Sequence, residues 1–307
     1  MSVTVSPTPT LTQRFSVVSV LPTMVLIAWP VFLIGCQAFT GRPRPGELLR
    51  FLGTLNVAQV SVLALLAVAI GSLFHPFQFL LVRLLEGYWS TIPVLRTLAP
   101  LGVELNRRRM RRLVRRNDGR QLRKLYPPDE SELLPTKLGN VLRAGERQAG
   151  RPYGMDAVLM LPRIYPVASP GIAAAFLDRR NQLDVAARYT AVSGLMAVSG
   201  FVAFADDGAW LTLPAMLSGV TVLSYRAAVR TAVSYGEALR WLFDLNHAQV
   251  TQALGWPVPH DIGKLKDLNR QIEQWLEDDA EAPPGYRGPD ASTAQAEPPP
   301  CDDTAYL

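Results

Sequence analysis

The sequence predicts an all-α membrane protein in which two transmembrane helical hairpins flank a small central cytoplasmic unit with amphipathic cytoplasmic helices. Three observations predict this class. Of the 307 residues, 49% are hydrophobic and 19% are charged, whereas a soluble domain usually carries about a quarter charged residues. The apolar residues gather in four long uncharged runs. A dense group of basic residues lies between the second and the third run.

The first two uncharged runs have the length of membrane spans. Phe15–Cys36 and Leu55–Phe74 contain no charged residue, and a hydrocarbon core about 30 Å thick takes roughly 20 helical residues. Pro22 and Pro30 predict kinks in the first run, which membrane helices tolerate. The sequence therefore predicts a first transmembrane hairpin over residues 15–74.

The third and fourth uncharged runs, Tyr189–Ala205 and Ala209–Tyr225, are shorter. A polar turn that contains Asp206 and Asp207 joins them, and Trp210 fits the aromatic belt of a membrane interface. A buried hairpin of a soluble domain is the alternative interpretation, which the lack of a polar face on either run disfavours. We therefore expect a second transmembrane hairpin over residues 189–225.

The distribution of basic residues predicts the orientation. Residues 75–188 contain 20 Lys and Arg against 10 Asp and Glu, whereas residues 37–54 contain three Arg and one Glu. The positive-inside rule places the basic segment in the cytoplasm. Both termini then lie in the cytoplasm as well, namely the tail 1–14 and the C-terminal helices 226–280. The remaining residues, 281–307, are rich in Pro, Ala, Asp and Glu, which predicts a disordered tail.

Cys36 carries an alternative interpretation of the N-terminus. Leu33–Cys36 matches the pattern at which bacterial lipoprotein signals are cut and lipidated. However, Arg14 is the only basic residue before the run, and the run is longer than a signal core of about 7–15 residues. Cys301 is the other cysteine, so the sequence predicts no disulfide framework.

The cytoplasmic segments show helix signals. His75–Trp89 and Arg226–His247 each follow a predicted span with amphipathic spacing, which is typical of helices that lie in the interface. Thr136 is a candidate cap of a short helix within Leu134–Ala168, which we expect to be a small folded unit. The prolines of Pro162–Pro166 predict that this stretch is not a regular helix.

Two further helix starts follow from capping signals. Ser169 and Pro170 are suited to the N-cap and first position of a long helix, which we expect to run without a break into the third span. Asp261 can cap a helix that carries Leu265, Leu268, Ile272 and Trp275 on one stripe. We expect that stripe to pack against the cytoplasmic unit, with docking to a partner as the alternative.

The most distinctive feature is Asn106–Lys124, in which ten of nineteen residues are basic. Met110, Leu113 and Val114 place a narrow apolar stripe on it. Bases near an anionic leaflet contribute about 1 kcal/mol each, so we expect this run to bind anionic phospholipid or an acidic partner. A solvated charge run is the plainer interpretation, and the lack of interleaved aromatic residues disfavours nucleic acid. The candidate binding residues are Arg107, Arg108, Arg109, Arg111, Arg112, Arg115, Arg116, Arg120, Arg123 and Lys124.

No catalytic or cofactor motif stands out. The three histidines, His75, His247 and His260, lack the spacing of a metal site. Asp156 and Arg163 are candidates for a polar site, although a structural ion pair between them is the plainer expectation. The sequence therefore predicts that the protein is not an enzyme and binds no cofactor.

Several short motifs resemble those of a group of multi-pass membrane proteins from GC-rich Gram-positive bacteria that have no established function. These motifs are His75-Pro76-Phe77 with Leu84–Trp89, Pro135–Asn140, Tyr153–Ala157 and Pro162–Pro166. Arginine outnumbers lysine 27 to 4, which is also typical of a GC-rich genome. The resemblance covers roughly Leu55–Pro257 and implies a bacterial plasma-membrane location. It implies no activity and no site residues.

Together, these features favour a non-catalytic membrane anchor or scaffold subunit that presents a basic cytoplasmic platform to anionic phospholipid or to a protein partner. An oligomeric channel or transporter component is the alternative. The predicted spans contain no charged residue, so Pro22, Pro30, Gln59 and Ser61 are the features that could shape a path. Self-association would supply the additional helices that a pore needs.

Overall fold

A computed structural model describes residues 24–39, 82–89, 93–278 and 282–286, together with separate positions between 43 and 80. Every regular element in these residues is a helix, which confirms the all-α prediction for the described part. The chain divides into two compact units: residues 1–99 with 181–231, and residues 100–180 with 232–307.

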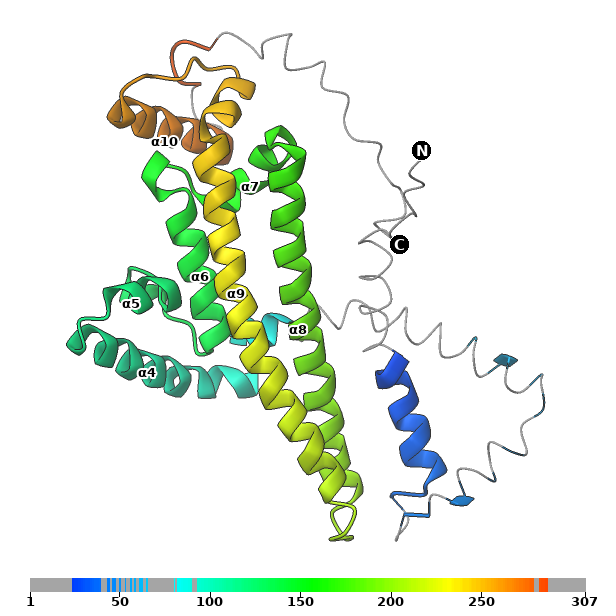
Figure 1. The fold of residues 1–307 in the computed structure, drawn as a ribbon. Coiled ribbons are helices and arrows are strands. Elements are labelled where there is room, and N and C mark those ends of the chain that lie inside the picture. Colours follow the sequence, from blue (N-terminus) through cyan, green and yellow to red (C-terminus); the bar gives the residue numbers. More distant parts are fainter. Residues whose placement is uncertain are drawn as a thin grey trace, which may run out of the picture. The chain divides into compact units, whose positions relative to one another are not determined.

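Helices of very different length make up the described chain (Figure 1). A short apolar helix, Met24–Gly35, comes first. It is followed along the chain by α4 (Pro93–Arg115), α5 (Gly119–Leu125), the 3-10 turn η2 (Glu130–Glu132), α6 (Lys137–Ala149), the 3-10 turn η3 (Arg151–Tyr153), α7 (Ala157–Val167), α8 (Pro170–Ala203), α9 (Thr212–Ala253) and α10 (Ile262–Asp278).

In the first unit, the Met24–Gly35 helix packs on the hairpin of α8 and α9. Trp29 is buried in an apolar cluster with Leu33, Met196 and Phe204. The indole Nε1 of Trp29 donates a hydrogen bond of 3.0 Å to Ser199 Oγ. The hydrogen bond gives the indole N–H of Trp29 a partner inside the apolar cluster, as a buried polar group requires.

A hydroxyl pair joins α8 to α9 within the same unit. Thr221 Oγ1 donates to Ser193 Oγ over 3.0 Å, and Ser193 Oγ donates to the Tyr189 carbonyl one turn earlier in α8. A Cβ added at Gly194 would lie 3.4 Å from the Thr221 methyl group, so the small residue permits the close approach. The two helices therefore hold together without a charged contact at this point.

Among the described residues, one helix has the length and apolar composition to cross a membrane, namely α8. It contains most of the predicted third span and begins at Pro170, so the uninterrupted helix that the sequence predicts is confirmed. The predicted fourth span is only partly helical, because the turn predicted at residues 205–208 extends to residue 211 and α9 begins at Thr212. Its uncharged helical part, up to Tyr225, comprises about four turns.

The described residues cover the predicted first hairpin only in part. Of the first span, Met24–Gly35 is helical, and Cys36 is fully buried just after it. The second span, Leu55–Phe74, lies outside the described residues apart from separate positions. Within the predicted helix His75–Trp89, residues 82–86 are helical and a turn at Gly87 ends the helix.

The second unit has an apolar core between α6, α7, α8 and α9. Met160, Ile164, Leu242 and Phe243 are fully buried there. The backbones of α6 and α9 nearly touch at Gly145 and Gly236, where an added Cβ on Gly145 would lie 2.8 Å from the Cα of Gly236. Glycine is therefore required at this crossing by the closeness of the two backbones.

The prediction that Pro162–Pro166 is not helical is wrong, because α7 runs through both prolines. Met160 and Ile164 stand one turn apart on the buried side of α7, whereas the prolines lie on its exposed side. A proline removes one backbone hydrogen bond of the preceding turn. The carbonyls that lose a partner belong to Val158 and Pro162, which are both exposed residues, so the cost is smaller than that of a buried break.

The predicted caps are confirmed. Thr136 Oγ1 accepts from Gly139 N over 3.1 Å at the start of α6. Asp261 Oδ1 accepts from the backbone N–H groups of residues 263 and 264 at the start of α10. The predicted packing of α10 against the small folded unit of residues 134–168 is also confirmed, because Asn269 is buried and donates to the Tyr153 carbonyl over 2.8 Å.

Candidate functional site

The predicted basic run forms a helical hairpin of α4 and α5. Asn117 turns the chain with a φ of 54°, and Asp118 Oδ1 caps α5 by accepting from Gln121 N over 3.0 Å. Met110 of α4 packs with the buried Tyr126 and Leu133 in a small apolar cluster. The hairpin is therefore a folded element with a core of its own.

Asn106 fixes the buried side of α4. Its Nδ2 group donates to three carbonyls: Gly102 in its own helix at 3.1 Å, and Leu134 and Pro135 at 3.3 and 2.9 Å. Leu134 and Pro135 lie just before α6, so this side chain attaches α4 to the segment that leads into α6. Because Asn106 is buried, these bonds determine which face of α4 points outward.

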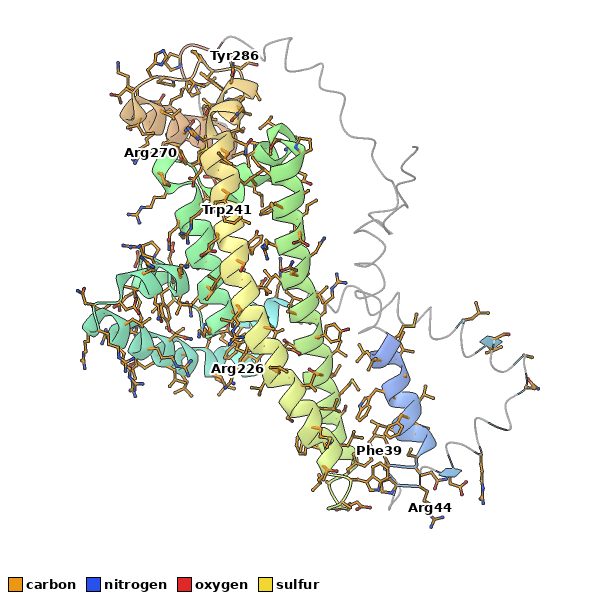
Figure 2. All side chains as sticks on the ribbon, in the orientation of Figure 1. Phe39, Arg44, Arg226, Trp241, Arg270 and Tyr286 are labelled. Carbon is orange, nitrogen blue, oxygen red and sulfur yellow. The ribbon has the colours of Figure 1, made fainter. Side chains whose placement is uncertain are left out.

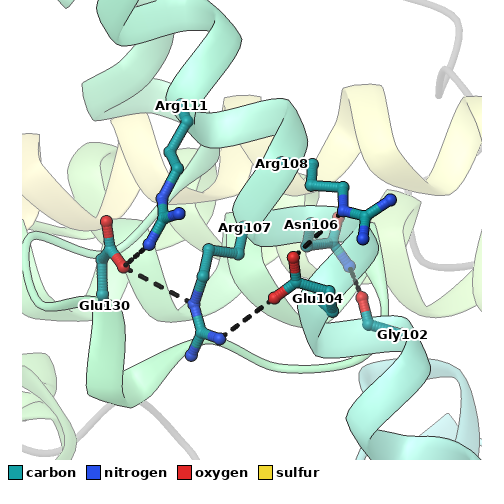
Figure 3. Close-up of polar contacts among 7 residues, drawn as sticks. All are labelled: Gly102, Glu104, Asn106, Arg107, Arg108, Arg111 and Glu130. Atoms are coloured by element: carbon teal, nitrogen blue, oxygen red, sulfur yellow. Dashed lines mark hydrogen bonds and ion pairs between the residues drawn. The ribbon is translucent and has the colours of Figure 1, made fainter.

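Four of the ten predicted bases have acidic partners, and Figure 3 shows three of these bases, Arg107, Arg108 and Arg111. Arg107 pairs with Glu104 at 3.1 Å and with Glu130 at 3.5 Å. Arg108 pairs with Glu104 at 3.0 Å, and Arg111 with Glu130 at 3.6 Å. The hydrogen bond from Arg108 is the main reason that the pKa of Glu104 lies below its ordinary value. Lys124, the fourth base, pairs with Glu237 of α9 at 2.7 Å.

The other six bases are exposed and form no ion pair with any described residue. We call them the unpaired arginines: Arg109, Arg112, Arg115, Arg116, Arg120 and Arg123. Figure 2 shows nitrogen-tipped side chains along α4 and α5 that extend away from the ribbon. The structure thus divides the predicted run into four neutralised bases and six available ones.

The unpaired arginines of α4 share one face. At about 100° per residue, Arg109, Arg112 and Arg115 fall within an arc of about 120°. That arc lies opposite Met110 and Asn106, which are buried. Arg116 follows in the turn, and the last two members lie three residues apart on α5. The arrangement can hold several anionic groups at once, because each guanidinium offers a planar set of donors.

The other candidates from the sequence have structural roles. His247 stacks on Tyr153 with ring centroids 3.9 Å apart. The ion pair expected between Asp156 and Arg163 is absent: Asp156 caps α7 and pairs with Arg147 at 3.0 Å, whereas Arg163 donates to the Leu159 carbonyl. The described residues contain no group of His, Cys, Asp and Glu suited to a metal ion. His75 lies outside the described residues.

An open depression beside η2 is occupied by an ion-pair network. Arg147 lies in its wall and bonds Glu132 at 2.7 Å as well as Asp156. The hydrogen bond to Glu132 raises the pKa of Arg147 above its ordinary value. These contacts pair Arg147 with carboxylates of the protein itself. The lining residues are Pro128, Asp129, Glu130, Glu132, Arg147 and Arg151.

Comparison with known proteins adds no assignment. No family model, curated protein or solved structure matches this chain. Sequence reasoning missed the acidic partners Glu104, Glu130 and Glu237. Only Glu104 could have been found from spacing, because it lies three and four residues before the arginines it pairs with.

Proposed function

We propose that the protein is a non-catalytic membrane anchor or scaffold subunit whose unpaired arginines bind anionic phospholipid at the cytoplasmic leaflet. The observation that carries the proposal is the set of six exposed arginines without acidic partners among the described residues. A protein that neutralises its own charge pairs such residues internally, as it does for Arg107 and Lys124. Six arginines without an acidic partner in the described part of the chain favour an external anion.

Two observations support the membrane location. Helix α8 has the length and composition of a span. In the first unit, α8 and α9 also expose large apolar side chains, among them Val198, Val202, Met216 and Leu223, each at least 65% exposed. Soluble proteins rarely expose several large apolar side chains together on one pair of helices. We further propose that the chain forms two transmembrane hairpins in a bacterial plasma membrane. The basic segment 75–188 then places both termini in the cytoplasm.

The unpaired arginines can contribute several kcal/mol to the free energy of membrane binding. Each Lys or Arg near an anionic leaflet contributes about 1 kcal/mol. Engagement of half of the unpaired arginines would therefore contribute about 3 kcal/mol, which corresponds to roughly a hundredfold in affinity. The screening length of salt is about 10 Å at 0.1 M and shortens as ionic strength rises. The attraction between exposed arginines and lipid phosphates therefore weakens at high salt.

The test compares two charge-matched variants of the full chain in detergent. One variant replaces Arg112, Arg115 and Arg116 by Gln, and the other replaces Lys264, Lys266 and Arg270 of α10 by Gln. Native mass spectrometry then measures retention of phosphatidylglycerol against phosphatidylcholine. We expect the α4 variant to lose most of its preference for phosphatidylglycerol and the α10 variant to keep it.

Equal preference in both variants and in the unmodified protein would contradict the proposal. Recovery from cell membranes of an acidic protein at fixed stoichiometry, lost only in the α4 variant and without any lipid preference, would contradict it too. That outcome would replace the lipid by a protein partner.

A further inference from the structure

The middle of α4 exposes leucines on the same face as the unpaired arginines that follow them. Leu101 is 65% exposed and Leu105 is 55% exposed. At about 100° per residue, both fall within the arc of about 120° that holds Arg109 and Arg112. This face of the helix is therefore apolar at Leu101 and Leu105 and basic beyond them.

The opposite face of α4 is fixed, so the leucines cannot turn inward. A Cβ added at Gly102 would lie 2.6–2.9 Å from atoms of Pro135, which shows how closely the helix approaches this segment. Asn106 bonds the same segment, and Met110 is buried below it. Rotation of α4 would break these contacts. The exposure of Leu101 and Leu105 thus follows from the packing of the hairpin.

We infer that α4 inserts into the surface of an anionic bilayer, with Leu101 and Leu105 in the upper acyl region and the arginines among the phosphates. The inference rests on the proposed function, because the arginines supply the attraction. Interfacial helices bury their apolar side about 5–10 Å into the headgroup and acyl boundary. Leu105 and Arg112 are seven residues apart, or about 10 Å along the helix axis.

If α4 is tilted so that Leu101 and Leu105 lie deeper than the arginines, its leucines reach the acyl chains while its arginines stay among the phosphates. The distance of about 10 Å between Leu105 and Arg112 is similar to the depth of this boundary region. A soluble polyanion would use the arginines but leave the leucines in water. An acidic protein surface would pair with the arginines, but its charges alone would not cover the exposed leucines. The order of exposed leucines followed by exposed arginines along α4 favours the bilayer, in which the apolar layer adjoins the anionic headgroup layer. The long arginine side chains can reach the phosphates from the helix.

The test measures the depth of single labelled positions in the full chain. Cys36 and Cys301 are first replaced by Ala, and a cysteine is introduced in place of Leu105, Arg112 or Gln271. A nitroxide label on each variant, in discs of phosphatidylcholine and phosphatidylglycerol, is exposed to apolar oxygen and to a water-soluble nickel chelate. Gln271 is exposed on α10 and serves as the aqueous reference.

We expect the label at position 105 to favour oxygen, the label at 112 to be intermediate, and the label at 271 to favour nickel. Labels at 105 and 271 with equal nickel accessibility would overturn the inference. Substitution of both Leu101 and Leu105 by Ser adds a second measurement, for which we expect about tenfold weaker phosphatidylglycerol binding.

The two proposals fail differently. If replacing Arg112, Arg115 and Arg116 removes the lipid preference while the label at 105 stays aqueous, only the insertion is wrong. If the lipid preference survives that replacement, the proposed function is wrong. Thermal unfolding of each variant shows whether a loss reflects a folding defect instead.

Discussion

Glu273 on α10 makes the attachment of that helix depend on pH. Its side chain accepts a hydrogen bond from the backbone N–H of Asp156, the residue that caps α7. Burial raises the pKa of Glu273 from its ordinary 4.5 to about 7, and the nearby carboxylates of Asp156 and Glu277 act in the same direction. The hydrogen bond and Arg270 oppose the shift. The folded protein therefore binds a proton at Glu273 more tightly than the unfolded chain does.

The sign and the magnitude follow from this shift. A raised carboxyl pKa gives stability that is fully present below about pH 4.5 and is lost as the pH rises to about 7. One pKa unit corresponds to about 1.4 kcal/mol, which sets an upper limit of about 3 kcal/mol. Because the side chain of Glu273 is only partly buried, solvent screening reduces the expected effect to about 1–2 kcal/mol.

The substitution Glu273→Gln tests this reasoning, because Gln keeps the acceptor oxygen and removes the charge. At pH 8 we expect the variant to protect the α10 amides from hydrogen exchange about tenfold better than the unmodified protein, after correction for the intrinsic exchange rate. At pH 5 we expect nearly equal protection. Asp267→Asn removes an exposed carboxylate from the same helix and should change protection little. Equal protection of Glu273→Gln and the unmodified protein at pH 8 would refute the argument.

Three further predictions concern the second unit, each measured as a change in thermal unfolding. Gly145→Ala should destabilise it by about 1–3 kcal/mol, because the new methyl group meets the backbone of Gly236; Gly119→Ala, which meets nothing within 4 Å, is the matched control and should not destabilise. Asn140→Leu should cost about 1–3 kcal/mol, since it removes hydrogen bonds of 2.8 Å to three partly buried backbone groups; an unchanged midpoint would show that water replaces them. Lys124→Gln should cost less than about 1 kcal/mol, because its ion pair is partly exposed, and a larger loss would assign that pair a structural role.

Local signals allowed the helix boundaries in the second unit to be predicted. Thr136, Asp261 and the Ser169-Pro170 pair mark the starts of α6, α10 and α8, because a cap or a first-turn proline acts within a few residues. The all-α class also followed from local patterns. Such features depend on the residues beside them in the sequence, so they can be read without knowledge of the fold.

The failures lie where distant residues decide the outcome. The proline-rich stretch of α7 is helical because Met160 and Ile164 bury one face in a core built from α6, α8 and α9. Likewise, Glu130 and Glu237 neutralise bases that lie 19 to 113 residues away. No spacing rule brings these partners together. The sequence therefore predicted the basic run but could not separate its paired members from the unpaired ones.

The most direct test of the central claim is chemical footprinting of the arginines with a dicarbonyl reagent. The full chain is placed in discs of phosphatidylcholine alone and in discs that also contain phosphatidylglycerol. Modification is then measured at each arginine by mass spectrometry. We expect phosphatidylglycerol to protect Arg112, Arg115 and Arg116 strongly, and to change the reactivity of Arg270 on α10 little. Equal reactivity of the α4 arginines in both kinds of disc would contradict the claim that they bind anionic lipid.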